Sequence, residues 1–147
     1  MRLIVLVLLL AAAPSVVPFA VPSSVPLAAQ QGASRWKEIG RTSTGNTVYV
    51  DPRSISKKDS IITATVRVVF AKPSETPQGP ITGSRAVAMF NCARGTVAVK
   101  ENIIWHDERK GKIYVKNVPK IPGFGPVFTS NFSGVALTYL CKAERAA

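Results

Sequence analysis

The sequence contains few of the residues that most often carry catalysis or bind metal ions. Its 147 residues include one histidine, His106, two cysteines, Cys92 and Cys141, and only 8 acidic residues. Structural zinc sites use closely spaced pairs of ligands, and a nucleophilic cysteine needs a base within hydrogen-bond reach. His106 lies too far along the strand after Cys92 for such contact. We therefore expect no catalytic residue, no metal site and no cofactor.

Charge is missing from the first 34 residues, apart from Arg2. Arg2 and the apolar run over residues 3–13 have the form of a secretory signal peptide. A membrane-anchoring helix is the alternative for so long an uncharged stretch. Prolines at positions 14, 18, 22 and 26 oppose it, because each removes a helical hydrogen bond. The sequence predicts a signal peptide over residues 1–29, a linker over 30–34 and one domain over 35–147.

Export has consequences for the two cysteines. No cysteine follows the apolar run, so we expect a periplasmic or secreted product that is not a lipoprotein and has no transmembrane segment after cleavage. In an oxidising compartment an even cysteine count indicates a disulfide. A Cys92–Cys141 bond closes a loop of about 50 residues, which is worth roughly 4 kcal/mol in the chain-entropy model. We predict this disulfide.

The scarcity of acidic residues leaves a large positive charge. Without the predicted signal peptide the chain has 18 Lys and Arg against 8 Asp and Glu, a net charge of +10. Such a surplus attracts acidic proteins, anionic glycans and anionic lipid surfaces. The alternative is that the charge serves only solubility. Nucleic acid is not an expected partner, because no recognition helix or aromatic and basic RNA-binding pattern accompanies the charge.

Alternation of apolar and polar residues dominates the rest of the chain and predicts strands. In "SIITATVRVVFA", Ile62, Ala64 and Val66 share one face, as in an antiparallel strand with one face on a core. "TVYVD", "SRAVAMFNC", "TVAVKENIIWH" and "KIYVKNV" behave similarly. In the fourth, Val97, Val99, Ile103 and Trp105 have one parity, and a bulge is expected near residues 100–102 because Glu101 would otherwise point inward.

Near the C-terminus the apolar period changes from two to that of a helix. Apolar residues recur at helical spacing, at Phe132, Val135, Ala136, Tyr139 and Leu140. Ser130 is the expected N-cap, and the helix is expected to end near Cys141. The predicted fold is of the α+β class, an antiparallel β-sheet of about six strands with a C-terminal α-helix packed on one face.

Two neighbouring stretches are candidates for binding a partner. Basic residues gather at a predicted hairpin tip and in the strand leaving it, with Lys112, Tyr114 and Lys116 on one strand face; the group is Arg109, Lys110, Lys112, Lys116 and Lys120. An ordinary solvated sheet face is the alternative. The proline-rich "VPKIPGFGPVF" carries Phe124, which either contacts a partner or, like Phe128, plugs the end of the sheet.

The remaining aromatic candidates have simpler interpretations. His106, beside two acidic residues in "WHDERKGK", has the position of a solvated strand-end histidine, although a metal or haem contact is an alternative. Trp36 and Trp105 could form a ligand platform. Tryptophan at strand parity is more often part of a core.

Several of these segments together resemble the surface-adhesin protein E family of exported bacterial proteins. They are "RWKEIG" with Trp36, "TVYVDPRSI", "SRAVAMFNCARGTVAV" and the closing "YLCK", and their order spans residues 34–143. The resemblance implies an antiparallel sheet, a C-terminal helix and a Cys92–Cys141 disulfide. The family's named member is an outer-membrane lipoprotein that binds host matrix and serum proteins. This chain lacks the lipidation cysteine, and no ligand-contact motif of the family matches here.

The combined prediction is an exported, non-catalytic binding protein of the bacterial envelope. Its expected partner is an acidic protein or an anionic glycan or lipid surface, bound through residues Arg109, Lys110, Lys112, Tyr114, Lys116, Lys120 and Phe124. The alternative is a structural or inhibitory periplasmic protein with no adhesin role. Nothing in the sequence indicates an oligomeric state.

Overall fold

The computed structural model describes residues 35–142. The predicted signal peptide, the linker and residues 143–147 lie outside the described residues. The described chain forms eight strands, a 3₁₀ turn (η2) and one α-helix. Their bounds are β1 Lys37–Arg41, β2 Thr47–Val50, η2 Pro52–Ser54, β3 Ser56–Lys58, β4 Ile61–Ser74, β5 Ile81–Asn91, β6 Thr96–Asp107, β7 Lys112–Asn117, β8 Gly125–Pro126 and α1 Phe132–Leu140.

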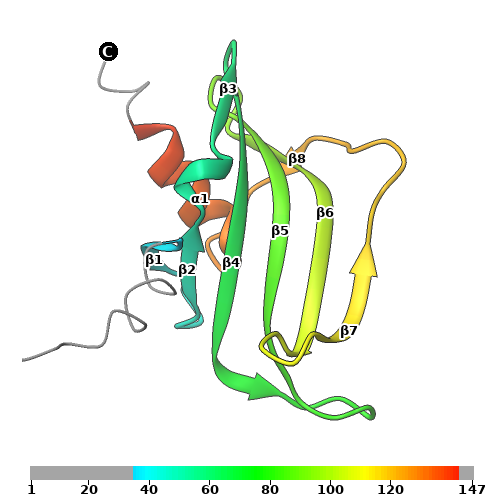
Figure 1. Cartoon of the computed structure of the whole chain (residues 1–147). Helices are drawn as coiled ribbons and strands as arrows, with labels where there is room; N and C mark the ends of the chain where they lie inside the picture. Colours follow the sequence, from blue (N-terminus) through cyan, green and yellow to red (C-terminus); the bar gives the residue numbers. More distant parts are fainter. Residues whose placement is uncertain (1–34, 143–147) are drawn as a thin grey trace, which may run out of the picture.

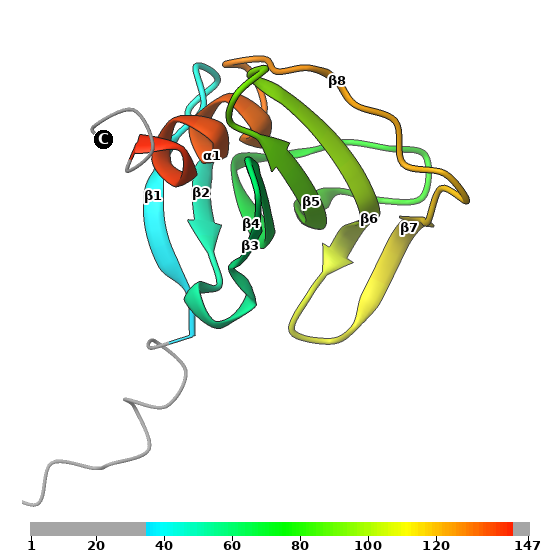
Figure 2. The same ribbon diagram turned by 90° about the horizontal axis from the view of Figure 1, so that it is seen from above.

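The strands form one antiparallel sheet in the order β1-β2-β4-β5-β6-β7. The short strands β3 and β8 add to β4 and β6, respectively. The sheet is strongly curled, and α1 lies against it on the side of β1, β2 and β4 (Figure 1). Seen from above, the η2 turn and the β6–β7 hairpin extend away from α1 (Figure 2). The predicted fold, an antiparallel sheet with a C-terminal helix on one face, is confirmed.

The hydrophobic core lies between α1 and the sheet. Its buried members are Val48, Val50, Ile62, Ala64, Val66, Ala88, Phe90, Val97, Ala136 and Leu140. These residues alternate along β2, β4 and β5, as the period of two predicts, because successive side chains of a strand point to opposite faces. Burial of this apolar area is the main stabilising contribution to such a fold.

A bulge interrupts β6 where the sequence predicts it. Val87 pairs with Glu101 and Ala88 with Val99, so Lys100 is the extra residue. One prediction about its consequence is wrong. The extra residue reverses the alternation, so Ile103 and Trp105 lie on the face opposite Val97, alongside Arg85 and Gly83. Ile103 and Trp105 are buried, but they belong to the face that α1 does not cover.

The register also shifts twice between β6 and β7. Ile104 pairs with Val115, but Trp105 pairs with Ile113. Because Ile104 and Trp105 point to opposite faces, Ile113 and Val115 do as well. Lys116 pairs with Ile103 and so lies on the side of Ile113, which means that the prediction of one shared strand face for Lys112, Tyr114 and Lys116 is wrong. All six residues of β7 are exposed.

The N-cap of the helix lies one residue later in the sequence than predicted. Asn131, not Ser130, is the N-cap, and its side-chain oxygen accepts a hydrogen bond from the backbone N–H of Ser133 at 2.9 Å. The helix ends at Leu140, and Cys141 is its C-cap. There the predicted disulfide joins Cys141 to Cys92, with their Cα atoms 5.4 Å apart. The bond fastens the end of α1 to the turn between β5 and β6.

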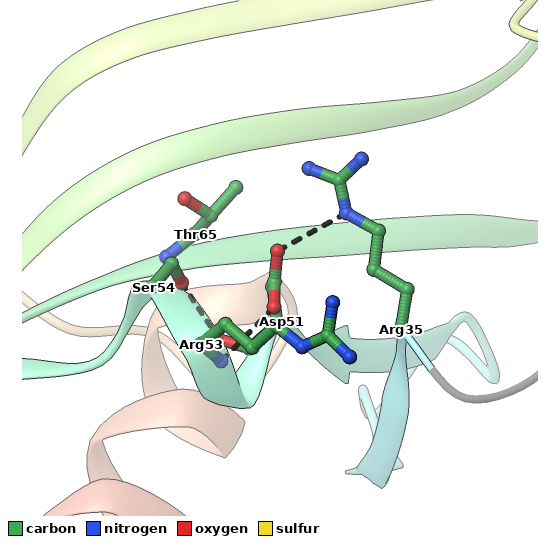
Figure 3. A network of polar contacts seen from close by, with 5 residues as sticks. All are labelled: Arg35, Asp51, Arg53, Ser54 and Thr65. Atoms are coloured by element: carbon green, nitrogen blue, oxygen red, sulfur yellow. Dashed lines mark hydrogen bonds and ion pairs between the residues drawn. The ribbon is translucent and has the colours of Figure 1, made fainter.

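The "VDPRSI" segment folds into a turn that secures β2 to β4 (Figure 3). The carboxylate of Asp51 accepts hydrogen bonds from Arg53 N–H at 3.0 Å and from Arg35 Nε at 3.1 Å. The Ser54 hydroxyl donates to the Asp51 carbonyl and accepts from the Thr65 N–H, both at 2.7 Å. Asp51 is buried, so these donors compensate the loss of water around its charge. The segment has a structural role.

Candidate binding surfaces

The predicted basic group lies at the tip of the β6–β7 hairpin and along β7, the edge strand after β6. The Asp107 carboxylate orders the tip, because it accepts hydrogen bonds from the backbone N–H groups of Arg109 and Lys110 at 3.0 and 3.2 Å. Gly111 supplies the positive φ of 67° that this turn needs. The tip and β7 thus hold Arg109, Lys110, Lys112 and Lys116 on one edge of the molecule, with Lys120 in the segment that follows.

Not all of these charges are equally available to a partner. Lys116 Nζ lies 3.2 Å from a Glu101 carboxylate oxygen, and Lys110 Nζ lies 3.8 Å from Asp107. Within residues 35–142, no ion pair involves Arg109, Lys112 or Lys120. Lysine on an edge strand has a second effect, since it discourages unwanted pairing with another strand.

Exposed apolar side chains are concentrated next to these cations. Nine large hydrophobic residues are exposed in the described part of the chain, and seven of them fall within residues 113–128. We call these seven the apolar strip: Ile113, Tyr114, Val115, Val118, Ile121, Phe124 and Phe128. Concentrations of exposed apolar side chains of this kind mark interaction sites more often than isolated ones do.

The strip ends in a proline-stiffened segment that leaves the sheet and returns to it. Residues 118–124 join β7 to β8, which pairs with the start of β6 (Figure 1). Ile121, between Pro119 and Pro122 in the sequence, is 88% exposed. Phe124 and Phe128 are 44% and 54% exposed, so neither plugs the end of the sheet. Proline fixes φ, which lowers the entropy lost when such a segment binds.

The structure gives Cys92 and His106 structural roles. Cys92 is bonded to Cys141, so it offers no thiolate to a substrate or metal. His106 Nδ1 lies 2.8 Å from the Pro80 carbonyl oxygen, and its ring packs edge-on against Tyr114 with centroids 5.2 Å apart. No cluster of three or more histidine, cysteine or acidic side chains suited to a metal ion occurs within residues 35–142.

A second surface was missed by the sequence reasoning. On the face that α1 leaves uncovered, the Arg67 guanidinium lies 5.8 Å from the Trp36 ring centroid, and Arg85 lies 5.6 Å from that of Trp105. Arg35 also stacks on Trp36, at 5.5 Å. We call Trp36, Arg67, Arg85 and Trp105 the arginine–tryptophan cluster. The sequence pattern of β4 does predict that Arg67 points away from the core. It does not predict that Trp105 lies on the same face, because this depends on the bulge at Lys100.

A comparison with protein-family models identifies the family of this chain. The chain belongs to the surface-adhesin protein E family, whose model matches residues 36–142. It is thus a surface adhesin-like protein of a family of surface or exported proteins. Within the described residues, no helix has the length and apolar character needed to cross a membrane.

Solved structures of one bacterial protein are similar to the chain. A structure of Haemophilus influenzae protein E is 14% identical, with 78% of this chain and 89% of that chain covered, at a TM-score of 0.48. A second crystal form is 16% identical, with 87% and 98% covered, at 0.49. Protein E from non-typeable Haemophilus influenzae is 15% identical, with 89% and 86% covered, at 0.48. No curated protein matches the chain.

Proposed function

We propose that this protein is an exported, non-catalytic binding protein of the bacterial envelope that attaches to a protein partner through β7 and the segment after it. The observation that carries the proposal is the apolar strip, which holds seven of the nine large hydrophobic residues exposed in residues 35–142. Membership of the surface-adhesin protein E family supports a binding role over a catalytic one.

The proposed contact combines apolar and charged groups. Phe124, Tyr114 and Ile121 are the anchors, since large side chains inserted into a partner's recess supply most of the binding energy of an interface. Five basic side chains flank them and select a partner with acidic groups around that recess: Arg109, Lys110, Lys112, Lys116 and Lys120. Complementary charge of this kind raises the association rate and its sensitivity to salt.

The experiment measures binding of the purified protein to a panel of matrix and serum proteins and to bacterial envelope extract. Ile121→Ser and Phe124→Ser should each weaken capture by about tenfold or more. Ile55→Ser is the matched control, because Ile55 is also exposed, at 38%, but lies outside the strip. Equal binding by wild type and both strip variants would contradict the proposal.

A charge reversal separates the basic group from the strip. Lys112→Glu and Lys120→Glu are chosen because Lys110 and Lys116 already have acidic partners. Both substitutions should weaken binding to the partner and reduce the salt dependence of that binding. Lys72→Glu, on the exposed end of β4, makes the same charge change away from this surface. If Lys72→Glu weakens binding as much, the effect is one of net charge and the basic group is not the contact.

The alternative is a structural or inhibitory envelope protein with no adhesin role. The observation that favours it is the stiffened segment around Ile121, which has the form needed to fill a recess in another envelope protein. Capture from envelope extract alone, with no binding to matrix or serum proteins, would support this alternative. Capture from the matrix panel that depends on Ile121 would support the adhesin function.

A further inference from the structure

A transverse row of side chains crosses the sheet on the face that α1 does not cover. The cross-strand partners Glu38, Tyr49, Arg67, Arg85, Ile103 and Lys116 come one from each main strand. Neighbouring strands are about 4.8 Å apart. Arg67 and Arg85 are therefore direct neighbours, at the centre of this row.

Two like charges placed directly opposite each other destabilise a sheet unless something compensates them. Arg67 has compensation within the chain, because its Nε lies 2.6 Å from a Glu108 carboxylate oxygen. Lys116, at the end of the row, has Glu101. Arg85 pairs with no carboxylate of residues 35–142 and donates no hydrogen bond to them. Within the described residues, the charge of Arg85 at the centre of the row therefore has no acidic partner.

Arg85 is held in place for such an anion. Its guanidinium stacks on Trp105, which is only 8% exposed and so forms a fixed platform. Arg67 also stacks on a ring, that of Trp36, but its Nε–H already donates to Glu108. A guanidinium fixed on an aromatic ring keeps its planar fork of N–H donors free for two parallel hydrogen bonds to a carboxylate or sulfate group.

The side chains around the two arginines indicate what carries that anion. Tyr49 lies next to Arg67 in the row, and Thr47 and Thr65, each two residues away along its strand, lie on the same face. Their hydroxyl groups donate and accept hydrogen bonds. The apolar strip lies farther along the sheet, on the edge strand β7 and the segment after it. A face of guanidinium and hydroxyl groups fits a partner rich in hydroxyls and negative charge.

We propose that this face binds an acidic glycan, a polysaccharide that carries sulfate or carboxylate groups, and that Arg85 holds one of its anionic groups. The site is centred on β4 and β5, whereas the strip follows β7, and it does not rest on the proposed protein partner. Trp36 and Trp105 both lie in the cluster, so their fluorescence reports binding at this face.

The test is a tryptophan-fluorescence titration with a heparin-derived hexasaccharide. Arg85→Ala should raise the dissociation constant by about tenfold or more, because it removes a bidentate charged contact. Arg85→Lys keeps the charge without the fork and should show an intermediate loss. Arg94→Ala is the matched control; Arg94 is an exposed arginine in the β5–β6 turn, and its removal should change binding by less than about twofold.

Each outcome decides the proposal. Unchanged binding by Arg85→Ala, or an equal loss in Arg94→Ala, overturns it. If Arg85→Ala fails to fold, Arg85→Lys decides: a weakened complex at an unchanged melting temperature supports the site, and wild-type binding overturns it. A hexa-aspartate peptide that binds more tightly than the hexasaccharide overturns the glycan assignment. Ile121→Ser should leave the titration unchanged, so failure of the strip and failure of this site are distinguishable.

Discussion

At the scale of single residues, a few small or polar side chains fix how neighbouring segments of the fold meet. Asp51 is buried where its carboxylate accepts from Arg35 and Arg53. Gly83 faces the Val68 carbonyl so closely that an added Cβ would lie 2.5 Å from its oxygen. Such positions fix how neighbouring segments meet, and substitution at them has effects that hydrophobicity does not indicate.

Gly134 provides a residue-scale prediction in which two effects have opposite signs. Alanine is the better helix former by about 1 kcal/mol, so propensity alone predicts that Gly134→Ala stabilises the protein. In the structure a Cβ there would lie 2.8 Å from the Phe128 carbonyl oxygen and 3.0 Å from its carbon. We expect the backbone clash to dominate and to lower the free energy of unfolding by about 1–3 kcal/mol.

Urea unfolding followed by circular dichroism measures the effect. Gly123→Ala is the control, because an added Cβ there meets nothing within 4 Å and its φ is not positive. A Gly134→Ala protein as stable as wild type, or more stable, would show that the loop at Phe128 moves freely away from the helix.

At the scale of elements, periodicity predicted the strands and the helix, but not how the bulge in β6 changes the facing of the side chains that follow it. The core positions of β2, β4 and β5 follow from simple alternation. The bulge was also predictable, since Glu101 would otherwise have pointed into the core. Its effect on Trp105 was not, because one extra residue reverses every later side chain of the strand. The arginine–tryptophan cluster could therefore not be predicted from the sequence, because it depends on this reversal and on the pairing of β4 with β5.

Deletion of Lys100 tests the bulge as an element. Without the extra residue β6 would resume strict alternation, which would turn Ile103 and Trp105 toward α1 and Ile104 outward. Because protein cores are close-packed, an added indole should disrupt this core, and we expect a loss of cooperative unfolding and of soluble expression. Lys100→Ala keeps the bulge and removes only an exposed side chain, so it should change stability by less than about 0.5 kcal/mol.

Near-ultraviolet circular dichroism and thermal melting measure both variants. If the deletion variant melts cooperatively near the wild-type temperature, β6 tolerates either register. The burial of Trp105 would then not depend on the bulge.

At the scale of the whole molecule, the two predicted functions are centred on different strands of one curled sheet. The strip and its cations follow β7 and the segment toward β8, whereas the arginine–tryptophan cluster lies across the face opposite α1. The positive charge of the chain predicted an anionic partner, but composition could not place it. Four of the five basic residues named from sequence lie at the tip or on the edge strand. Arg85, which has no ion pair within residues 35–142, lies in the interior of β5, where the sequence alone gives no sign of a binding role.

The disulfide is the one covalent link between distant parts of this molecule, joining residues 49 apart in sequence. It ties the C-terminal end of α1 to the β5–β6 turn, so it constrains the helix that covers the core. In the chain-entropy model a closed loop of this length lowers the entropy of the unfolded chain by an amount worth about 4 kcal/mol. That is a large share of the 5–15 kcal/mol typical of small domains.

We therefore expect the Cys92→Ser/Cys141→Ser double variant to lose about 4 kcal/mol of unfolding free energy, with the β-sheet signal retained in the folded fraction. Urea unfolding of the variant, and of wild type with and without reductant, measures the loss. The reduced wild type should match the variant, because both have open loops. Ala93→Ser, beside Cys92 on the exposed turn, controls for added hydroxyl groups there. Equal stability of oxidised and reduced wild type would mean that packing of Ala136 and Leu140 against the sheet holds α1 without the bond.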